Sequence, residues 1–285
     1  MQGRAVNRGR IRNKGLAHAV QSLRAIVMRE LIKFWQQKAR LFSALVRPVL
    51  WLAVFAAGFR NVFGVAIVEP YDTYIPYDIY IAPGLIGMVL LFNGMQSSLA
   101  MVYDREMGLM RLLLTAPLPR WFLLLAKMLA TAVLSFLQVL AFLAVAALLG
   151  TALPMSPLPV AHAILAILVS ALMLAAVGLL LSVYVRQLEN FAGTMNFVIF
   201  PMYFLSTALY PLWKLEESGA TWVYRVAQCN PFTHAVEWIR FALYGKDPGM
   251  APWIVLGTLA VCFTLACWGY DPQRGFGGLT QRGSA

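Results

Sequence analysis

Charged residues are scarce in this sequence. Aspartate, glutamate, lysine and arginine make up 12% of the 285 residues, whereas hydrophobic residues make up 60%. Ordinary globular domains carry about 25% charged residues. A soluble core of this size cannot bury so much apolar surface, so lipid must cover part of it. The composition therefore predicts an integral membrane protein.

Cysteine and histidine are also rare. The cysteines form no CxxC pair and no metal-ligand spacing; they are Cys229, Cys262 and Cys267. The histidines are scattered, at His18, His162 and His234. Only His234 has a carboxylate at helical spacing, that of Glu237, and one polar face of a short helix accounts for that pair. We expect no catalytic residue, no metal site and no cofactor on this chain.

Long uncharged runs are present instead, and they predict membrane-spanning helices. Residues 79–103 carry no charge and would form a helix of ~37 Å at ~1.5 Å per residue, enough to cross a bilayer. Residues 128–185 are also uncharged, but they are too many for one crossing, and the proline-rich segment 153–159 divides them. The predicted spans are residues 41–59, 79–102, 121–150, 160–184, 190–213 and 248–270.

Two of these spans contain residues that disturb a plain apolar helix. The first span requires Arg47 to lie near the cytoplasmic edge, where its guanidinium can extend to the headgroups. Pro201 is expected to kink the fifth span.

The basic residues are distributed unequally between the predicted loops. Sixteen Lys and Arg fall in residues 1–40, 103–120, 185–190 and 271–285, and five fall in 60–78, 151–160 and 214–247. The positive-inside rule places the first group, and with it both termini, in the cytoplasm. We therefore expect an all-α, multi-pass protein of the cell (inner or plasma) membrane. Its six-helix transmembrane domain would comprise residues 41–270, flanked by cytoplasmic segments 1–40 and 271–285.

The N-terminal segment is strongly basic. Residues 1–40 carry ten Lys and Arg against one acid, Glu30. Within it, residues 16–40 alternate apolar and polar positions at three- and four-residue steps, which predicts an amphipathic helix. Such a helix would lie in the membrane interface with its cations toward anionic lipid, or pack on the protein's own cytoplasmic end. We expect membrane lipid and no nucleic acid as the partner of this segment.

The inner loop 103–120 contains a short apolar helix that Pro117 would end. An apolar helix on the cytoplasmic side needs a cover, either a partner protein or the bilayer surface. The residues selected as candidates for this contact are Asp104, Arg105, Glu106, Met107, Met110, Leu113 and Leu114.

The outer segment 214–247 contains two stretches that are apolar but too short and charged to cross. Between them, Asn230 is expected to cap the second helix and Pro231 to occupy its first position. Glu237 and Arg240 are three residues apart on that helix and can pair. These features predict a re-entrant helical hairpin before the last span. Its candidate residues are Asn230, Pro231, Phe232, Glu237 and Arg240.

Two of these segments carry a family resemblance. The loop YDREMGLMRLLLTAPLPR at 103–120 and the stretch NPFTHAVEWIR at 230–240 resemble the characteristic loop and late signature of type-2 ABC exporter permeases. That family includes exporters of polysaccharides, nodulation factors and drugs. The resemblance covers roughly residues 16–270.

The resemblance implies roles for these segments. The helix after Asp104 would be the coupling helix that docks on a separate ATPase dimer, with residues 16–40 as the interface helix beside it. The hairpin around Asn230 would close the exit, and a second copy of the chain would complete the path. The sequence contains no GxxxxGK[ST] phosphate loop. ATP and Mg would therefore bind on the partner subunit.

A proton- or ion-coupled secondary transporter is the alternative. It requires ionisable groups in the middle of the membrane. The candidates are His162, Arg47 and Arg60, all expected near span ends. A membrane-embedded enzyme would require paired carboxylates, a Ser/His arrangement or a metal cluster, and the sequence contains none at suitable spacing.

Overall fold

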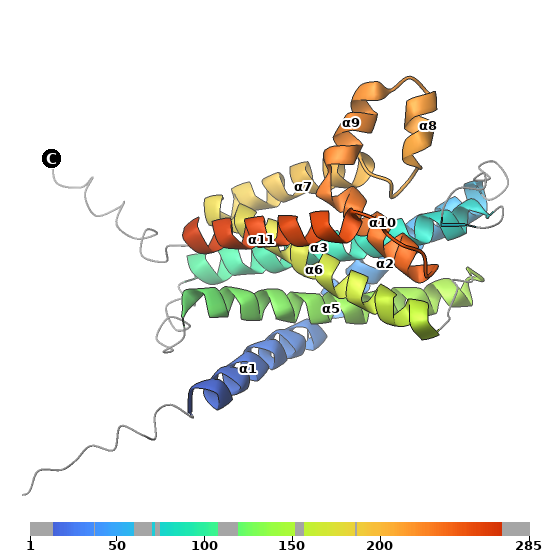
Figure 1. Ribbon diagram of the computed structural model, residues 1–285. Helices are drawn as coiled ribbons and strands as arrows, with labels where there is room; N and C mark the ends of the chain where they lie inside the picture. The colour runs from blue at the N-terminus through green and yellow to red at the C-terminus, as the bar shows by residue number, and fades with distance from the viewer. Residues whose placement is uncertain are drawn as a thin grey trace, which may run out of the picture.

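The computed structural model describes residues 14–36, 38–59, 70–71, 75–107, 119–151, 157–185 and 187–269. Helices dominate this part of the chain (Figure 1), so the predicted all-α class is confirmed. The helices are α1 (Lys14–Gln36), α2 (Lys38–Phe59), α3 (Tyr77–Glu106), α5 (Arg120–Leu148), α6 (Pro157–Tyr184), α7 (Leu188–Phe204), α8 (Leu212–Glu217), α9 (Thr221–Cys229), α10 (Pro231–Leu243) and α11 (Ala251–Gly269).

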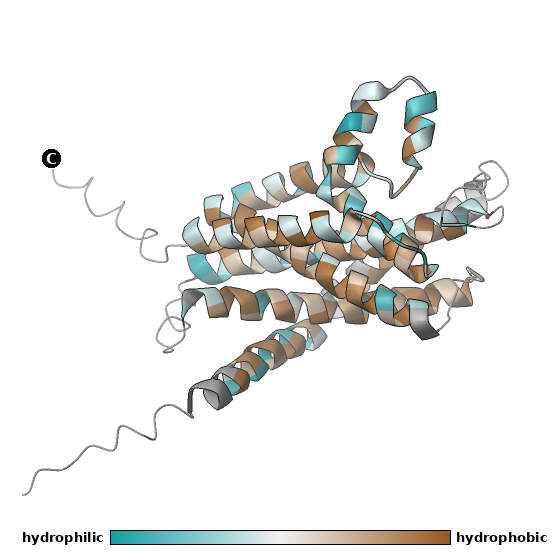
Figure 2. Cartoon of the chain, in the orientation of Figure 1, coloured by the Kyte–Doolittle hydropathy of each residue, from teal (hydrophilic) through white to brown (hydrophobic). Residues whose placement is uncertain are grey.

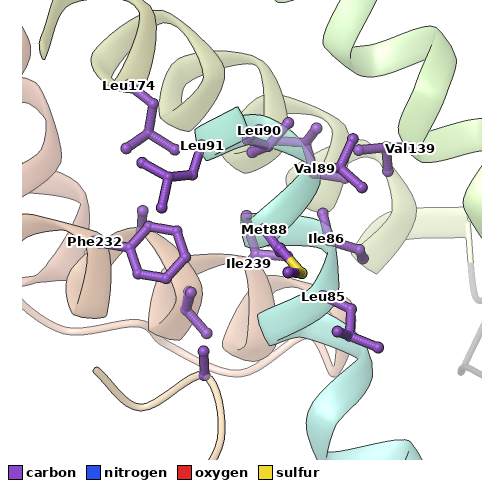
Figure 3. Packing of buried hydrophobic residues seen from close by; sticks show 14 of the residues in the cluster. Leu85, Ile86, Met88, Val89, Leu90, Leu91, Val139, Leu174, Phe232 and Ile239 are labelled. Carbon is purple, nitrogen blue, oxygen red and sulfur yellow. The ribbon is translucent and has the colours of Figure 1, made fainter. Parts of the chain in front are cut away.

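The central element of the bundle is α3. It packs against α2, α5, α6, α7 and α10, and most of its residues are buried along its whole length. Figure 3 shows the middle of the core, where Leu85 to Leu91 of α3 meet Val139 of α5, Leu174 of α6 and Phe232 of α10. A helix that is apolar all round belongs in the interior of a bundle.

The most extensive contact in the bundle is between α3 and α6. A Cβ atom added to Gly94 of α3 would lie 2.8 Å from the backbone oxygen of Leu174. Only glycine therefore allows the two backbones to approach so closely. Small residues at crossing points are the usual means of helix packing in membranes, where no hydrophobic effect drives helices together.

Among the described residues, four helices contain segments that are long and apolar enough to cross a membrane: Tyr77–Glu106, Trp121–Leu148, Pro159–Tyr184 and Ala251–Gly269. They correspond to four of the predicted spans. The apolar stretch of α2 is shorter, Leu45–Val54, and α7 has 17 residues. The count of six spans therefore stays a prediction. Figure 2 shows that hydrophobic residues run along the long helices, whereas α8 and α9 are mostly hydrophilic.

The helix predicted over residues 190–213 is shorter in the structure. Pro201 lies within α7, which ends at Phe204, and α8 begins only at Leu212. The reason lies outside the segment, because Asn230, the N-cap of α10, and Arg240 of α10 bind the carbonyl groups of Met202, Leu205 and Thr207. These carbonyls therefore have partners without a continuing helix.

The N-terminal helix ends earlier than predicted. α1 stops at Gln36, and residues 38–40 already belong to α2. α1 packs on α5 and α2 and buries Phe34, while Val20, Ile32 and Trp35 remain exposed. It thus contacts the protein's own bundle and still presents apolar side chains outward. In Figure 1, α1 leaves the bundle obliquely.

The α3–α6 crossing generates a stability prediction. We expect Gly94→Ala to lower the free energy of unfolding by about 1–3 kcal/mol, because the new methyl group overpacks a backbone contact. The measurement is thermal unfolding of the purified chain in a nonionic detergent. Gly193→Ala in α7 is the matched control, since its Cβ would meet no atom within 4 Å. Equal midpoints for both variants would contradict the packing argument.

Candidate functional site

One end of α3 carries three consecutive charged residues, and the structure assigns each to a different neighbour. The Asp104 side chain is only 3% exposed. Lys127 of α5 donates a hydrogen bond from Nζ to Asp104 Oδ2 at 3.2 Å, and Lys33 Nζ of α1 lies 3.7 Å from Oδ1. Two cations thus compensate one buried carboxylate, as burial of a charge requires.

Arg105 and Glu106 complete this end. Arg105 donates to the carbonyl oxygens of Ser182 and Val185, each at 3.0 Å, at the C-terminal end of α6. Glu106 Oε1 accepts a hydrogen bond of 2.8 Å from the backbone N–H of Leu188, the first residue of α7. Both contacts satisfy groups that helix ends leave unpaired, with the sign of charge that each helix dipole favours.

We call Lys33, Asp104, Arg105, Glu106 and Lys127 the α3-end cluster. It connects the end of α3 to α1, α5, α6 and α7, and its residues Asp104, Arg105 and Glu106 are the start of the predicted coupling loop 103–120. Among the candidate coupling residues, Met107 is exposed, and Met110, Leu113 and Leu114 lie outside the described residues. Asp104 is buried within the chain, so its side chain can act on a partner only through the helices it joins.

Sequence reasoning missed Lys33 and Lys127 as members of the cluster. The available signal was Lys127 itself, a single cation that precedes the uncharged run 128–185. A charge inside an apolar helix usually has a partner, but spacing alone did not identify Asp104 as that partner.

The predicted hairpin residues lie near the other end of α3. Asn230 is the N-cap of α10: its Oδ1 accepts from Phe232 N at 3.0 Å, and Pro231 occupies the first turn. Its Nδ2 donates to the carbonyl oxygens of Met202 and Leu205, both at 2.7 Å. One amide group therefore joins the start of α10 to the end of α7.

Phe232 and Arg240 bind α10 to the rest of the bundle. Phe232 is fully buried and packs on Tyr203, with ring centroids 6.0 Å apart. Arg240 pairs with Glu237 at 2.5 Å, as the spacing predicts. It also donates to Thr207 O at 2.8 Å, and its guanidinium carbon lies 4.2 Å over the Tyr80 ring. We call Asn230, Glu237 and Arg240, with residues 202–207, the α7–α10 junction.

Tyrosines surround this junction. Tyr71 contacts Tyr244 edge to face at 4.7 Å and also approaches Tyr80. Burial raises the pKa of Tyr71 to about 12, although the nearby Arg240 charge acts in the opposite direction. The phenol therefore stays neutral at physiological pH, and the apolar ring surface shields the Arg240 charge.

His162 and His234 have structural partners. Trp238 Nε1 donates to His162 Nε2 at 3.2 Å, near the start of α6. His234 Nε2 lies 2.8 Å from Gln228 O, while Glu237 pairs with Arg240 instead. Within the described part of the chain, no group of three His, Cys, Asp or Glu side chains is arranged to hold a metal ion.

Arg47 does not lie where the sequence suggested. Its guanidinium carbon is 3.8 Å over the ring of Phe92, which is halfway along α3. The expected position at the cytoplasmic edge was wrong. The cause is packing: α2 runs alongside α3, so its tenth residue faces the centre of the longer helix.

The sequence matches a known protein family over most of its length. Residues 21–244 match the sequence profile of the family described as "ABC-2 type transporter". The chain belongs to the ABC-2 type transporter family. The matched region contains both the α3-end cluster and the α7–α10 junction, and membership of this family makes the chain a membrane transport protein, an ABC-2 permease.

Three relatives carry the printed name "Putative transport permease ycf38". The protein from Porphyra purpurea is 28% identical over 80% of this ABC-2 permease and 76% of its own length. The one from Pyropia yezoensis is 26% identical over 78% and 74%. The one from Cyanophora paradoxa is 30% identical, also over 78% and 74%.

The α7–α10 junction generates a second prediction. Asn230→Ala should destabilise the permease by about 1–3 kcal/mol, because it removes the cap of α10 and both donors to α7. Asn230→Asp keeps the cap acceptor, but it replaces the donor by a carboxylate oxygen that faces the two α7 carbonyl oxygens, so its unfolding midpoint should also lie below that of the parent. Thermal unfolding in detergent measures this order, with exposed Asn190→Ala as the control. An Asp variant as stable as the parent would show that the α7 contacts contribute nothing.

Proposed function

We propose that this chain is the permease subunit of an ATP-driven exporter. Two copies would form the translocation path, and the segment after Asp104 would dock on a dimeric ATPase that binds ATP and Mg. The observation that carries this proposal is the α3-end cluster, because it joins the base of that segment to four other helices. A push on the segment would therefore move α1, α5, α6 and α7 together.

The proposed topology has six crossings, with α2 and α7 as the two shorter ones. The surplus of Lys and Arg in the inner segments favours cytoplasmic termini in the cell (inner or plasma) membrane. In Figure 1, the end of α11 lies at the same end of the bundle as the end of α3 and the start of α5. This agrees with a C-terminus on the side of the ATPase.

The proposed mechanism uses the two ends of α3. ATP binding would close the ATPase dimer and press on the segment between α3 and α5. The α3-end cluster would transmit this movement, and Tyr80, ~36 Å further along α3 at ~1.5 Å per residue, would carry it to Arg240. The α7–α10 junction would then shift the re-entrant hairpin formed by α9 and α10, which opens the exit.

The proton-coupled alternative is less well supported. Arg47 is a mid-helix cation, but a guanidinium does not deprotonate in proteins and cannot carry a transported proton. The Asp104–Lys127 pair lies at the end of α3, not at its middle. Transport that persists after ATP depletion and stops when the proton gradient is dissipated would favour this alternative.

Charge reversal tests the coupling role. Glu106→Arg removes the acceptor for Leu188 N–H and places a cation at the positive end of α7. We expect export, and stimulation of ATP hydrolysis by the permease, to fall at least tenfold. The measurement uses the permease co-expressed with its cognate ABC ATPase. Glu189→Arg, which is exposed in the same turn of α7, is the control: it places the same charge at the start of α7 without removing the acceptor for Leu188 N–H, so it should lose much less activity. Full transport by the Glu106 variant, at normal membrane abundance, would contradict the coupling role.

Cysteine labelling tests the topology. In a variant without the three native cysteines, Ser218→Cys in the turn after α8 should react with a membrane-impermeant maleimide in intact cells. Leu112→Cys should react only after the cells are permeabilised. Labelling of position 112 from outside would overturn both the topology and the coupling mechanism.

A further inference from the structure

Polar side chains continue from the α3-end cluster into the middle of the bundle. They form an antiparallel series between α3 and α5: Asp104 with Lys127, then Ser97 with Thr131 at 2.5 Å, then Asn93 with Gln138. Thr131 and Gln138 are 4% and 3% exposed. Polar groups buried in a membrane bundle are costly unless paired, and they often mark a functional path.

The series ends at a small cavity beside Arg47. The cavity is lined by Arg47 and Pro48 of α2, by Met88, Val89, Phe92, Asn93 and Gln96 of α3, and by Gln138 of α5. Gln138 accepts a hydrogen bond from Asn93, but its Nε2 donor has no partner among the described residues. A buried N–H without an acceptor costs about 1–3 kcal/mol.

The charge of Arg47 is not compensated either. Within the described residues, no carboxylate lies within ion-pair distance of it, and its recorded contact is the Phe92 ring. A cation–π contact contributes about 0.5–2 kcal/mol, whereas an arginine at the centre of a membrane helix costs at least about 2.5–3.5 kcal/mol. Two sets of donors therefore face one cavity, and the described chain supplies no anion to it.

We propose that Arg47 and Gln138 form a binding site for an oxyanion, phosphate or carboxylate, carried by an amphiphile. The guanidinium offers a planar pair of N–H donors that matches such a group, and the Gln138 amide adds another. Met88, Val89 and Phe92 form the apolar side of the cavity, and the adjoining hydrocarbon would lie outside its open side. The inference that this amphiphile is exported cargo rests on the proposed function; the binding site itself does not.

The test measures binding of dodecyl phosphate to the purified full-length permease in dodecyl maltoside. The detergent has the same alkyl chain with a neutral headgroup, so saturable binding reports recognition of the phosphate. We expect Arg47→Gln to raise the Kd at least tenfold and Gln138→Leu to raise it about three- to tenfold. Arg47→Lys keeps the charge but loses the planar pair of donors, so its Kd should lie between those of the parent and of Arg47→Gln.

Arg24→Gln is the matched control, because it removes an exposed cation from α1. Its Kd should change less than twofold. An unchanged Kd for dodecyl phosphate in Arg47→Gln would overturn the site. An equal loss of affinity in Arg24→Gln would also overturn it, because binding would then reflect attraction to the overall positive charge.

Thermal unfolding separates binding from a purely structural role. Without ligand, Arg47→Gln should be at least as stable as the parent, because it removes an uncompensated charge. Dodecyl phosphate should raise the midpoint of the parent and leave that of the variant unchanged. A less stable variant with the same ligand shift would overturn the site. If Arg47→Gln does not fold, an unchanged Kd in Gln138→Leu has the same consequence.

A final arm identifies the source of the oxyanion. The permease is placed in nanodiscs of zwitterionic lipid, with or without phosphatidylglycerol, and dodecyl phosphate binding is measured again. Competition by phosphatidylglycerol would support a site for lipid headgroups, and unaffected binding would support a site for a separate cargo. Both results uphold an oxyanion site. Neither requires the ATPase, so a failure here is distinguishable from a failure of the coupling test.

Discussion

The charge of the buried carboxylate of Asp104 is compensated by two lysines. This compensation organises the bundle where α3 ends. Asp104 is held by Lys127 and, more loosely, by Lys33, so α5 and α1 cannot slide along α3 without exposing a charge inside the protein. A buried ion pair adds little net stability, but breaking it costs about 3–5 kcal/mol. Its consequence is therefore geometric: this pair sets the register between α3 and α5, and the polar contacts at Ser97 and Asn93 follow in the same register.

At both ends of α3, side chains bind the unpaired backbone groups at the ends of neighbouring helices, although the residues differ. Arg105 and Glu106 bind the unpaired backbone groups where α6 ends and α7 begins, and Asn230 and Arg240 bind those where α7 ends. Helix ends need such partners wherever water is excluded. Because the partners are side chains of neighbouring helices, α7 is attached at both ends to elements that are distant in sequence. It can move only together with α3 and α10.

The middle of the bundle differs from both ends, because its polar groups are incompletely paired. Arg47 and Gln138 retain donors that the described chain does not satisfy, while the helix faces around them are apolar. Such a site is unfavourable when empty and becomes favourable when an acceptor arrives. This arrangement suits an ABC-2 permease that binds an amphiphile reversibly. If all donors were paired within the protein, none would be left to bind a ligand.

The sequence by itself determined the features that depend on short-range spacing. The uncharged runs predicted four helices that are long and apolar enough to cross a membrane, and Asn230 and Pro231 marked the start of α10. Glu237 and Arg240 pair because they are three residues apart. Only the tertiary structure decided the contacts between helices. Lys127 reaches Asp104 across 23 residues and Asn230 reaches Met202 across 28, and no local pattern specifies such a meeting. For the same reason α7 ended early and Arg47 lay deeper than expected: each outcome depended on which neighbour packed there, and helical periodicity describes one helix at a time.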